Sequence, residues 1–326
     1  MKRREFIAAV GGAAASPLLA QAQPSAMPII GFLNPQSPEA IAEPMRGLRQ
    51  GLKDAGFVEG ENLIIEYRWA DNRTERLTAL AEDLVRRGVA LIISTGGVQS
   101  ALAAKAATKS IPIVFNVADD PVSVGLVASL AKPGGNLTGV AILVAELTAK
   151  RLELLHIMVP SAVHVAVLSN PSNPAAKLVL GELEGAAQSM GLKVSSFQAS
   201  TSREIDAVFA NIARERVDAL FVAGDAFFLS RRVHLALLAV FHNLPAIAAL
   251  RDFTEAGGLM SYGASLRDAY RQVGTYAGRI LKGGNPVDLP VVQASKFELV
   301  INSQTARILS LTVPPSLLAT ADEAIE

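Results

Sequence analysis

The chain has 326 residues, half of them hydrophobic and few aromatic, and its formal charge at neutral pH is zero. This length suffices for two lobes of ordinary size, each with its own core, and the neutral balance offers no field that attracts nucleic acid. The sequence contains no cysteine, which excludes thiol catalysis, cysteine-ligated zinc, disulfides and a lipid-modified N-terminal cysteine.

The first segment, residues 1–22, is predicted to be an export signal peptide. Lys2-Arg3-Arg4 precedes an apolar, Gly/Ala-rich stretch, and Ala20-Gln21-Ala22 has the small-x-small pattern of a cleavage site near Ala22. The stretch is too short to span a membrane permanently. The paired arginines also fit a twin-arginine signal, so the twin-arginine and general secretory routes both stay open. We therefore expect a freely soluble protein that is exported to the periplasm.

Short apolar runs then alternate with helical patterns along the whole chain. In the first half, strands are predicted at 29–33, 63–67, 90–94, 113–116 and 137–142. Helices are predicted at 39–55, 73–87, 98–108 and 145–158. In the second half, strands are predicted at 163–168, 192–197, 219–222, 246–248, 259–262 and 297–301. The helices there are predicted at 175–190, 202–216, 227–243 and 265–282.

This alternation predicts an α/β fold with parallel sheets, because single helices separate the strands. Ten or more strands in one open sheet would be unusual, so we place a break near residues 143–145 that divides them into two sheets. No low-complexity linker marks the break. The sequence therefore predicts two doubly wound parallel-sheet lobes joined by a short hinge.

One loop pattern occurs twice. Asn34-Pro35-Gln36-Ser37-Pro38 and Asn170-Pro171-Ser172-Asn173-Pro174 both follow an apolar run and precede an amphipathic pattern. In each, we predict a side-chain N-cap (Ser37, Asn173) followed by proline at the first helical position. Two units that open alike indicate two similar lobes, whose facing rims form a cleft that closes on a small molecule.

Ligands of open parallel sheets bind beyond the carboxyl ends of the strands. The candidate ligand-binding residues lie in loops at those ends: Asn34, Ser37, Thr95, Gly96, Ser100, Asp120, Asn170, Ser172, Asn173, Asp225 and Tyr262. Helix N-termini there suit a carboxylate, and Asp120 and Asp225 suit an ammonium group, so the cleft fits a zwitterion such as an amino acid. Asp120 equally fits a cap of its own helix. Phe227 and Phe228 fit either an apolar wall beside Tyr262 or the core.

The signatures of other chemistries are missing from the sequence. There is no dinucleotide-binding G-x-G-x-x-G, no phosphate-binding P-loop and no G-x-S-x-G elbow. The four histidines lack the spacing of metal ligands. We predict no catalytic residue, metal or cofactor. Two alternatives stay open: an exported hydrolase or lyase, which would need a nucleophile–base pair, and a receptor that senses its ligand rather than delivering it.

Several segments together resemble the substrate-binding proteins of ABC importers, and more narrowly the tryptophan/tyrosine-type branch. They include the leader, 60–70, 111–115, 133–139, the second Asn-Pro loop, Tyr262-Gly263 and Lys282-Gly283. Asp120-Pro121-Val122 matches as well. Singly, none of these segments is specific. The stretch after Asp225 departs from relatives, which often carry smaller or more polar residues there, and this leaves the size of the pocket open.

The resemblance implies the type I periplasmic-binding-protein fold, in which the chain crosses between the lobes three times. Lobe 1 would then contain 23–143 plus 264–292, and lobe 2 would contain 144–263 plus 293–326. The resemblance also implies a small solute, an amino acid of the aromatic or branched type before other carboxylates, and a monomer that serves an ABC permease and ATPase in the inner membrane. It implies ligand contacts at the rim loops named above.

Overall fold

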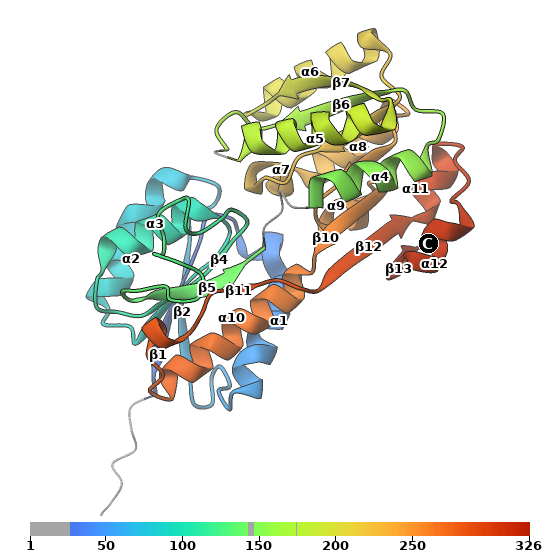
Figure 1. Ribbon diagram of the computed structural model, residues 1–326. Helices are drawn as coiled ribbons and strands as arrows, with labels where there is room; N and C mark the ends of the chain where they lie inside the picture. Colours follow the sequence, from blue (N-terminus) through green and yellow to red (C-terminus); the bar gives the residue numbers. More distant parts are fainter. Residues whose placement is uncertain (1–26, 143–146, 174) are drawn as a thin grey trace, which may run out of the picture.

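The computed structural model describes residues 27–142, 147–173 and 175–326. Two lobes lie one above the other, each with a central sheet, and extended segments connect them (Figure 1). The predicted signal peptide, the predicted break near 143–145 and Pro174 lie outside the described residues. In the described ranges, no helix is both long and apolar enough to cross a membrane.

The first lobe is built on a six-stranded sheet in the order β11-β5-β4-β3-β1-β2, and all of its strand pairs are parallel. The three central strands β4, β3 and β1 are almost completely buried, which explains their continuous apolar sequences. The strands are β1 (Ile29–Asn34), β2 (Ile64–Trp69), β3 (Leu91–Ser94), β4 (Ile113–Val117), β5 (Leu137–Ala141) and β11 (Val292–Gln293).

The second lobe has a seven-stranded sheet in the order β13-β12-β10-β9-β8-β6-β7. Its strands run parallel except at the antiparallel pair β10–β12. The strands are β6 (His164–Ser169), β7 (Lys193–Gln198), β8 (Ala219–Val222), β9 (Ala246–Ala248), β10 (Met260–Ala264), β12 (Phe297–Asn302) and β13 (Glu323–Ile325).

Helices cover both faces of each sheet, so each lobe is doubly wound, as predicted. In lobe 1, apolar clusters lie under α1 and α10 on one face and under α2 and α3 on the other. In lobe 2, they lie under α4 and α5 and under α6 and α8. The helices are α1 (Ala42–Asp54), α2 (Leu77–Arg86), α3 (Val98–Ala107), α4 (Thr148–Met158), α5 (Ala176–Met190), α6 (Ser202–Glu215), α7 (Ala226–Ser230), α8 (Arg232–Phe241), α9 (Arg251–Glu255), α10 (Leu266–Leu281), α11 (Ser303–Ile308) and α12 (Pro315–Thr320).

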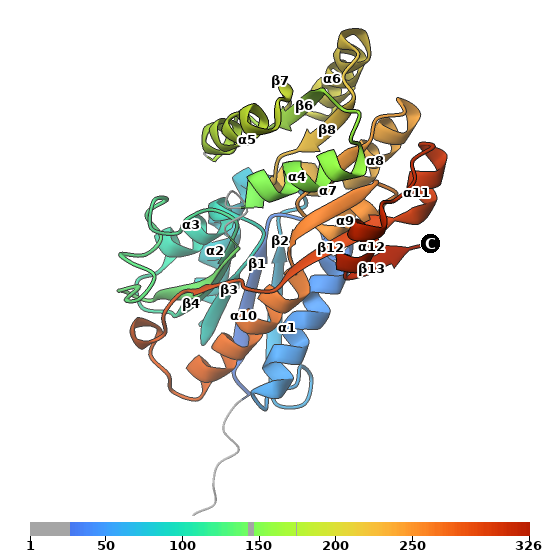
Figure 2. The same ribbon diagram turned by 45° about the vertical axis from the view of Figure 1, so that its right-hand side comes forward.

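Two of the connections between the lobes lie side by side. Strand β10 of the second sheet leads directly into α10, which packs on the first lobe, and β11 of the first sheet leads into β12 of the second (labelled in Figure 1 and seen from another side in Figure 2). Ala264 pairs with Phe297, and the Ser265 N–H donates to the Lys296 carbonyl oxygen at 3.0 Å. The helix at 265–282 therefore joins the first lobe and the strand at 297–301 joins the second, as the resemblance implied.

Glycines hold α10 tightly against α1. A Cβ atom on Gly47, Gly51 or Gly274 would collide with the backbone of the facing helix. The absence of side chains at these positions lets the two helix backbones approach closely, so α10 is fixed to lobe 1 although it directly follows a strand of lobe 2.

One local prediction was wrong and two were confirmed only in part. The single helix expected at 227–243 is two helices, α7 and α8, with a break at Arg231, whose ψ of 14° departs from helical geometry. No glycine or proline marks that break. Ser37 occupies the N-cap position and Pro38 follows it, as predicted, but the Ser37 side chain makes no capping hydrogen bond and the element is a 3₁₀ turn at Pro38–Ile41. The Asn173 Oδ1 atom accepts from the Ala175 N–H at 2.9 Å, so its side chain caps a turn as predicted, but α5 begins later, with Ala175 at its N-cap position. The helices α9, α11 and α12 and the strands β11 and β13 were not predicted.

Candidate functional site

A cleft of ≈ 1350 Å³, counting the solvent at its mouth, lies between the lobes at the carboxyl ends of both sheets. Lobe 1 contributes the loops after β1, β3 and β4, and lobe 2 contributes the loops after β6, β8 and β9. The first two turns of α10 add Leu266 and Tyr270. Five of these loops follow strands that the sequence pattern selected, whereas the loop after β9 was not selected and the selected Tyr262 does not line the cleft.

The repeated Asn-Pro loops have the same backbone hydrogen bond. The Asn34 Oδ1 atom accepts from the Gln36 N–H at 2.8 Å, and the Asn170 Oδ1 atom accepts from the Ser172 N–H at 3.0 Å. Each Asn side chain also donates from Nδ2 to the loop after the neighbouring strand. The acceptor is Thr95 Oγ1 in lobe 1, at 2.9 Å, and Asp225 Oδ1 in lobe 2, at 3.0 Å. The two rims are thus built alike, but their second partners differ.

Beneath the lobe 1 rim, Asn34 and Thr95 are completely buried and support the floor of the cleft. Tyr270 of α10 lies against them. Burial raises the pKa of Tyr270 to about 12, while hydrogen bonding with Thr95 and Asn34 acts in the opposite direction. The phenol is therefore neutral at physiological pH and serves as a fixed hydrogen-bonding group.

Gly96 is required where the β3–α3 loop passes the first Asn-Pro loop. Its φ is +83°, and a Cβ atom there would lie 2.7 Å from Pro35 Cδ and 2.9 Å from Asn34 Nδ2. The Ser100 hydroxyl stabilises the same turn by donating to the carbonyl oxygens of Thr95 and Gly97. No side chain caps α3, and its first residues line the cleft. The first N–H groups of a helix lack intrahelical partners, so this end of α3 offers donors to a ligand.

Asp225 is the charged group of the lobe 2 rim. Its Oδ1 atom accepts from the N–H groups of Phe227 and Phe228 and from Asn170 Nδ2. Its Oδ2 atom accepts from Asn173 Nδ2 at 2.9 Å. The carboxylate therefore caps α7 and joins both Asn side chains of the loop, so its position in the cleft is fixed before a ligand arrives.

Asp119, which the sequence analysis missed, is the carboxylate that lobe 1 contributes to the cleft. Partial burial raises the pKa of Asp119, and the charge of Asp225 raises it further. The neighbouring Asp120, which was predicted to face the ligand, is exposed and accepts from the N–H groups of Val122 and Ser123. Asp120 thus caps a turn, which was its alternative interpretation, and the cleft receives two facing carboxylates from different lobes.

Gln36 is the second residue that the sequence analysis missed. Its side chain is 3% exposed and lines the cleft, and its Nε2 atom has no hydrogen-bond partner among the described residues. Gln36 belongs to the repeated Asn-Pro loop, in which the sequence pattern favoured the neighbouring Ser37. Asp119 could have been found, because the Asp-Pro pattern already assigns Asp120 to a turn.

The walls of the cleft are apolar and come from both lobes. Ile41, Leu102 and Ile142 face Val179, Leu229 and Leu250. Phe227 and Phe228 do not line it: Phe228 is buried in the core under α6 and α8, and Phe227 packs against that core. The aliphatic lining residues from both lobes give the cleft a surface suited to an apolar side chain of a ligand.

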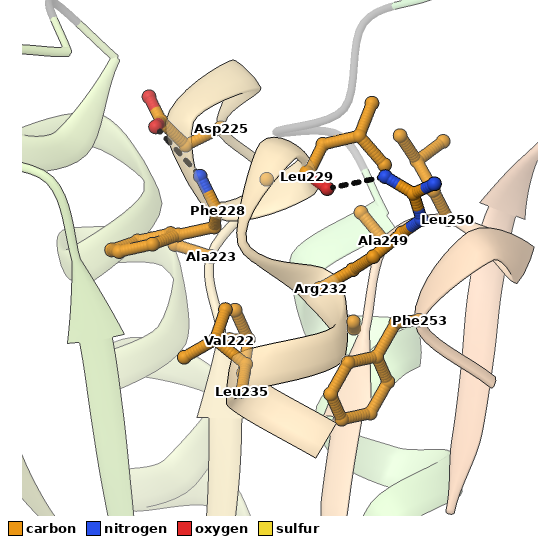
Figure 3. Close-up of a pocket in the computed structure, with 12 residues that line it drawn as sticks. Val222, Ala223, Asp225, Phe228, Leu229, Arg232, Leu235, Ala249, Leu250 and Phe253 are labelled. Atoms are coloured by element: carbon orange, nitrogen blue, oxygen red, sulfur yellow. Dashed lines mark hydrogen bonds between the residues drawn. The ribbon is translucent and has the colours of Figure 1, made fainter. Parts of the chain in front are cut away.

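A smaller pocket of ≈ 320 Å³, counting the solvent at its mouth, lies behind the lobe 2 rim and shares Asp225 and Leu229 with the cleft. Figure 3 shows its apolar lining between α7, α8 and α9, with Arg232 turned toward the Leu229 carbonyl oxygen. The Nη1 atom of Arg232 donates to that oxygen at 3.2 Å. This pocket therefore adjoins the cleft on its lobe 2 side.

The predicted site residues divide into two groups. Five line the cleft: Gly96, Asn170, Ser172, Asn173 and Asp225. The other six do not line it: Asn34, Thr95, Ser100, Ser37, Asp120 and Tyr262. Asn34, Thr95 and Ser100 form hydrogen bonds beneath the rim. Asp120 caps a turn, and Tyr262 belongs to strand β10 of the second sheet. Ligand contact stays a prediction for both groups. Across the described residues, no cluster of three or more His, Asp or Glu side chains is arranged to hold a metal ion.

Comparisons with known proteins agree with this architecture. A curated tyrosine-binding protein from Clostridioides difficile is 30% identical over 268 residues, which are 82% of this chain and 76% of that protein. An ABC domain in complex with L-Trp from Streptococcus pneumonia has a TM-score of 0.83 at 26% identity and covers 92% of this chain and 100% of its own. A ligand-free, open substrate-binding protein from Clostridium difficile has a TM-score of 0.70 at 28% identity. The match covers 91% of this chain and 99% of that protein.

More distant solved structures, among them solute-binding proteins, share the fold at 12–16% identity. The arrangement of two such lobes is the type I periplasmic-binding-protein fold. Residues 29–325 match the model of the family described as ABC transporter substrate binding protein. The match covers nearly the whole chain, and the chain therefore belongs to the ABC transporter substrate-binding protein family.

Proposed function

We propose that this protein is an exported receptor that captures an α-amino acid with an aromatic side chain and delivers it to an ABC permease without altering it. The observation that carries this proposal is the pair Asp119 and Asp225, which reach one cleft from opposite lobes. An ammonium group between them relieves their mutual repulsion and gains two charge-assisted hydrogen bonds. The aliphatic walls suit the side chain.

The relatives support the same class of solute. One is named as a tyrosine-binding protein and another was crystallised with L-Trp. The TM-score is higher with the L-Trp complex than with the ligand-free open protein, 0.83 against 0.70. This difference favours an arrangement of lobes in this chain that approaches the ligand-bound one. A ligand that contacts both rims stabilises such a closed form by its differential affinity for the two states.

The proposed lobes need two small adjustments from the sequence-based boundaries of 23–143 plus 264–292 and 144–263 plus 293–326. Ala264 pairs with Phe297 in the second sheet, so lobe 2 extends through residue 264. Gln293 pairs with Ala141 and the Ala294 N–H donates to the Ala141 carbonyl oxygen, so lobe 1 extends through residue 294. We propose that a monomer with these two lobes is the functional unit.

A thermal-shift screen with amino acids, organic acids and sugars tests the proposed solute. Aromatic amino acids should raise the Tm in a concentration-dependent manner, because a ligand that binds the folded state stabilises it by mass action. Titration calorimetry should then give one site per chain. A rise in Tm with sugars alone, or turnover of any compound in the screen, contradicts the proposal.

Export is tested separately by cell fractionation. We expect the protein in the periplasm, with its N-terminus near residue 23. Substitution of Arg3-Arg4 by Lys-Lys should block export if the twin-arginine route is used and leave it intact if the general secretory route is used. Recovery from the cytosol with the leader uncleaved contradicts an exported receptor.

A further inference from the structure

The buried amide of Gln36 is held in position by its backbone. The Gln36 N–H donates to Asn34 Oδ1 at 2.8 Å, and Asn34 Nδ2 donates to Thr95 Oγ1 at 2.9 Å. The loop is therefore anchored to two strand ends, while the Nε2 atom at the end of the side chain has no partner among the described residues. Buried amide groups are rarely left without partners, and the exceptions call for an explanation. Here the residue lines the ligand cleft, so a ligand is the natural partner of Nε2.

The N-terminus of α3 lies at the same side of the cleft. Gly97, Val98 and Gln99 line the cleft, and no side chain caps this helix. Gly96 brings the two elements together, since any side chain there would collide with Pro35. The unpartnered N–H groups of a ten-residue helix and a neutral amide donor thus converge on one region. Both features favour an anion.

The corresponding place in lobe 2 has the opposite character. Ser172 occupies the position of Gln36 in the repeated loop, and the loop there is joined to the Asp225 carboxylate rather than to a hydroxyl group. The cleft therefore has neutral donors near Gln36 and negative charge at Asp119 and Asp225. A solute with a carboxylate and an ammonium group matches this polarity in one orientation.

We propose that Gln36, together with the first turn of α3, binds the carboxylate of the solute and makes the protein select an amino acid over the amine that lacks this carboxylate. This inference rests on the proposed function and extends it to a specificity-determining residue. Because Nε2 has no partner among the described residues, its N–H groups remain available to the carboxylate.

Matched ligand pairs separate this role from a structural one. Calorimetry would compare L-tyrosine with tyramine and L-tryptophan with tryptamine on the wild type and on Gln36→Leu. We expect Gln36→Leu to weaken the amino acids by about tenfold or more, the loss of a hydrogen bond to a charged group, and to leave the weaker amines unchanged. Gln36→Glu should weaken the amino acids further by charge repulsion and strengthen the amines. Gln188→Leu, the same change at an exposed position of α5, should have no effect.

Two results would overturn the inference: an equal loss for amino acids and amines in Gln36→Leu, or unchanged affinity for the amino acids. Gln36→Asn is a second variant that keeps the amide on a shorter side chain. It should bind amino acids between wild type and Gln36→Leu, and binding as weak as that of Gln36→Leu or weaker also counts against the inference. A wild-type protein that binds no amino acid contradicts the proposed function itself, which is a separate outcome.

Discussion

The two rims of the cleft begin with the same Asn-Pro pattern and differ in what their polar groups already contact. In lobe 2, the Asp225 carboxylate accepts two backbone N–H groups and two Asn side chains. In lobe 1, Asn34 contacts a neutral hydroxyl group, and the Gln36 Nε2 atom has no partner in the described part of the chain. The rim of lobe 2 thus fixes the Asp225 carboxylate by hydrogen bonds before a ligand binds, while the rim of lobe 1 leaves the Gln36 Nε2 donor available for the ligand.

The largest effect is expected at the fixed carboxylate. Asp225→Ala should weaken the amino-acid ligand by roughly 1.5–3 kcal/mol, the scale of a hydrogen bond to a charged group. It should also lower the Tm, because α7 loses its N-cap. Asp225→Asn keeps an acceptor for the cap and should lose affinity with a smaller loss of Tm. Calorimetry and thermal unfolding measure the two effects, and unchanged affinity in both variants would remove Asp225 from the site.

The next effect concerns the place where the lobe 1 loops meet. Gly96→Ala should lower the free energy of unfolding by about 2 kcal/mol, because φ is +83° and the new methyl group collides with Pro35. Gly181→Ala, in a helix with open space around it, should instead raise it by up to about 1 kcal/mol. Urea unfolding distinguishes these opposite signs. Equal effects of the two substitutions would show that the close contact at Gly96 is unimportant.

A smaller effect, with a pH dependence, is expected at the lobe 1 carboxylate. The pKa of Asp119 is raised by burial and by Asp225, so the folded ligand-free protein takes up a proton at a higher pH than the unfolded chain does. The free energy of unfolding of the ligand-free protein therefore increases as the pH falls through the raised pKa of Asp119 in the folded state. At neutral pH this increase is absent. Protonation also removes the charge that attracts an ammonium group, so affinity should fall over the same range.

Asp119→Asn tests this coupling at neutral pH. It should weaken amino-acid binding by about 1 kcal/mol, roughly fivefold, yet stabilise the ligand-free protein slightly because the repulsion with Asp225 disappears. The acid-dependent fall in affinity should shrink in the variant. Asp120→Asn, at the exposed neighbour, should leave that fall intact. An identical pH profile in wild type and Asp119→Asn would separate Asp119 from ligand binding.

The smallest effect is expected at the predicted cap that the structure did not confirm. Ser37→Ala should change the free energy of unfolding by less than about 0.5 kcal/mol, since Ser37 caps no helix. Thr201→Ala should cost about 1 kcal/mol, because Thr201 forms a complete capping box with Glu204. Denaturant unfolding resolves this difference. A loss at Ser37 as large as that at Thr201 would restore the original interpretation.

Much of the fold was accessible from the sequence, because central strands of a parallel sheet are buried on both faces and read as continuous apolar runs. β1, β3 and β8 were found in this way. The short edge strands β11 and β13 carry little apolar signal, and their pairing depends on contacts distant in the chain. The break between α7 and α8 was missed because the apolar periodicity continues through Arg231. The crossings between lobes came only from the family resemblance.

The candidate site was predictable at the level of loops and less so at the level of side chains. The rule about strand ends selected the right edges, but neighbouring residues exchange roles within them. Asp120 is used by a turn while Asp119 faces the cleft, and Gln36 faces the cleft beside Ser37, which does not. Which of two adjacent side chains points inward depends on loop dihedral angles that local sequence patterns do not determine.

The paired crossings at Ala264–Ser265 and Lys296–Phe297 have a mechanical consequence. Two adjacent, hydrogen-bonded segments behave as a ribbon, which bends easily across its plane but resists shear along its length. Because glycine contacts clamp α10 to α1, the helix beyond this ribbon moves with its lobe. We therefore expect the lobes to open and close by bending at this ribbon and not by sliding past each other. A ligand whose binding requires such sliding would be excluded by the geometry of the connection, whatever its chemistry.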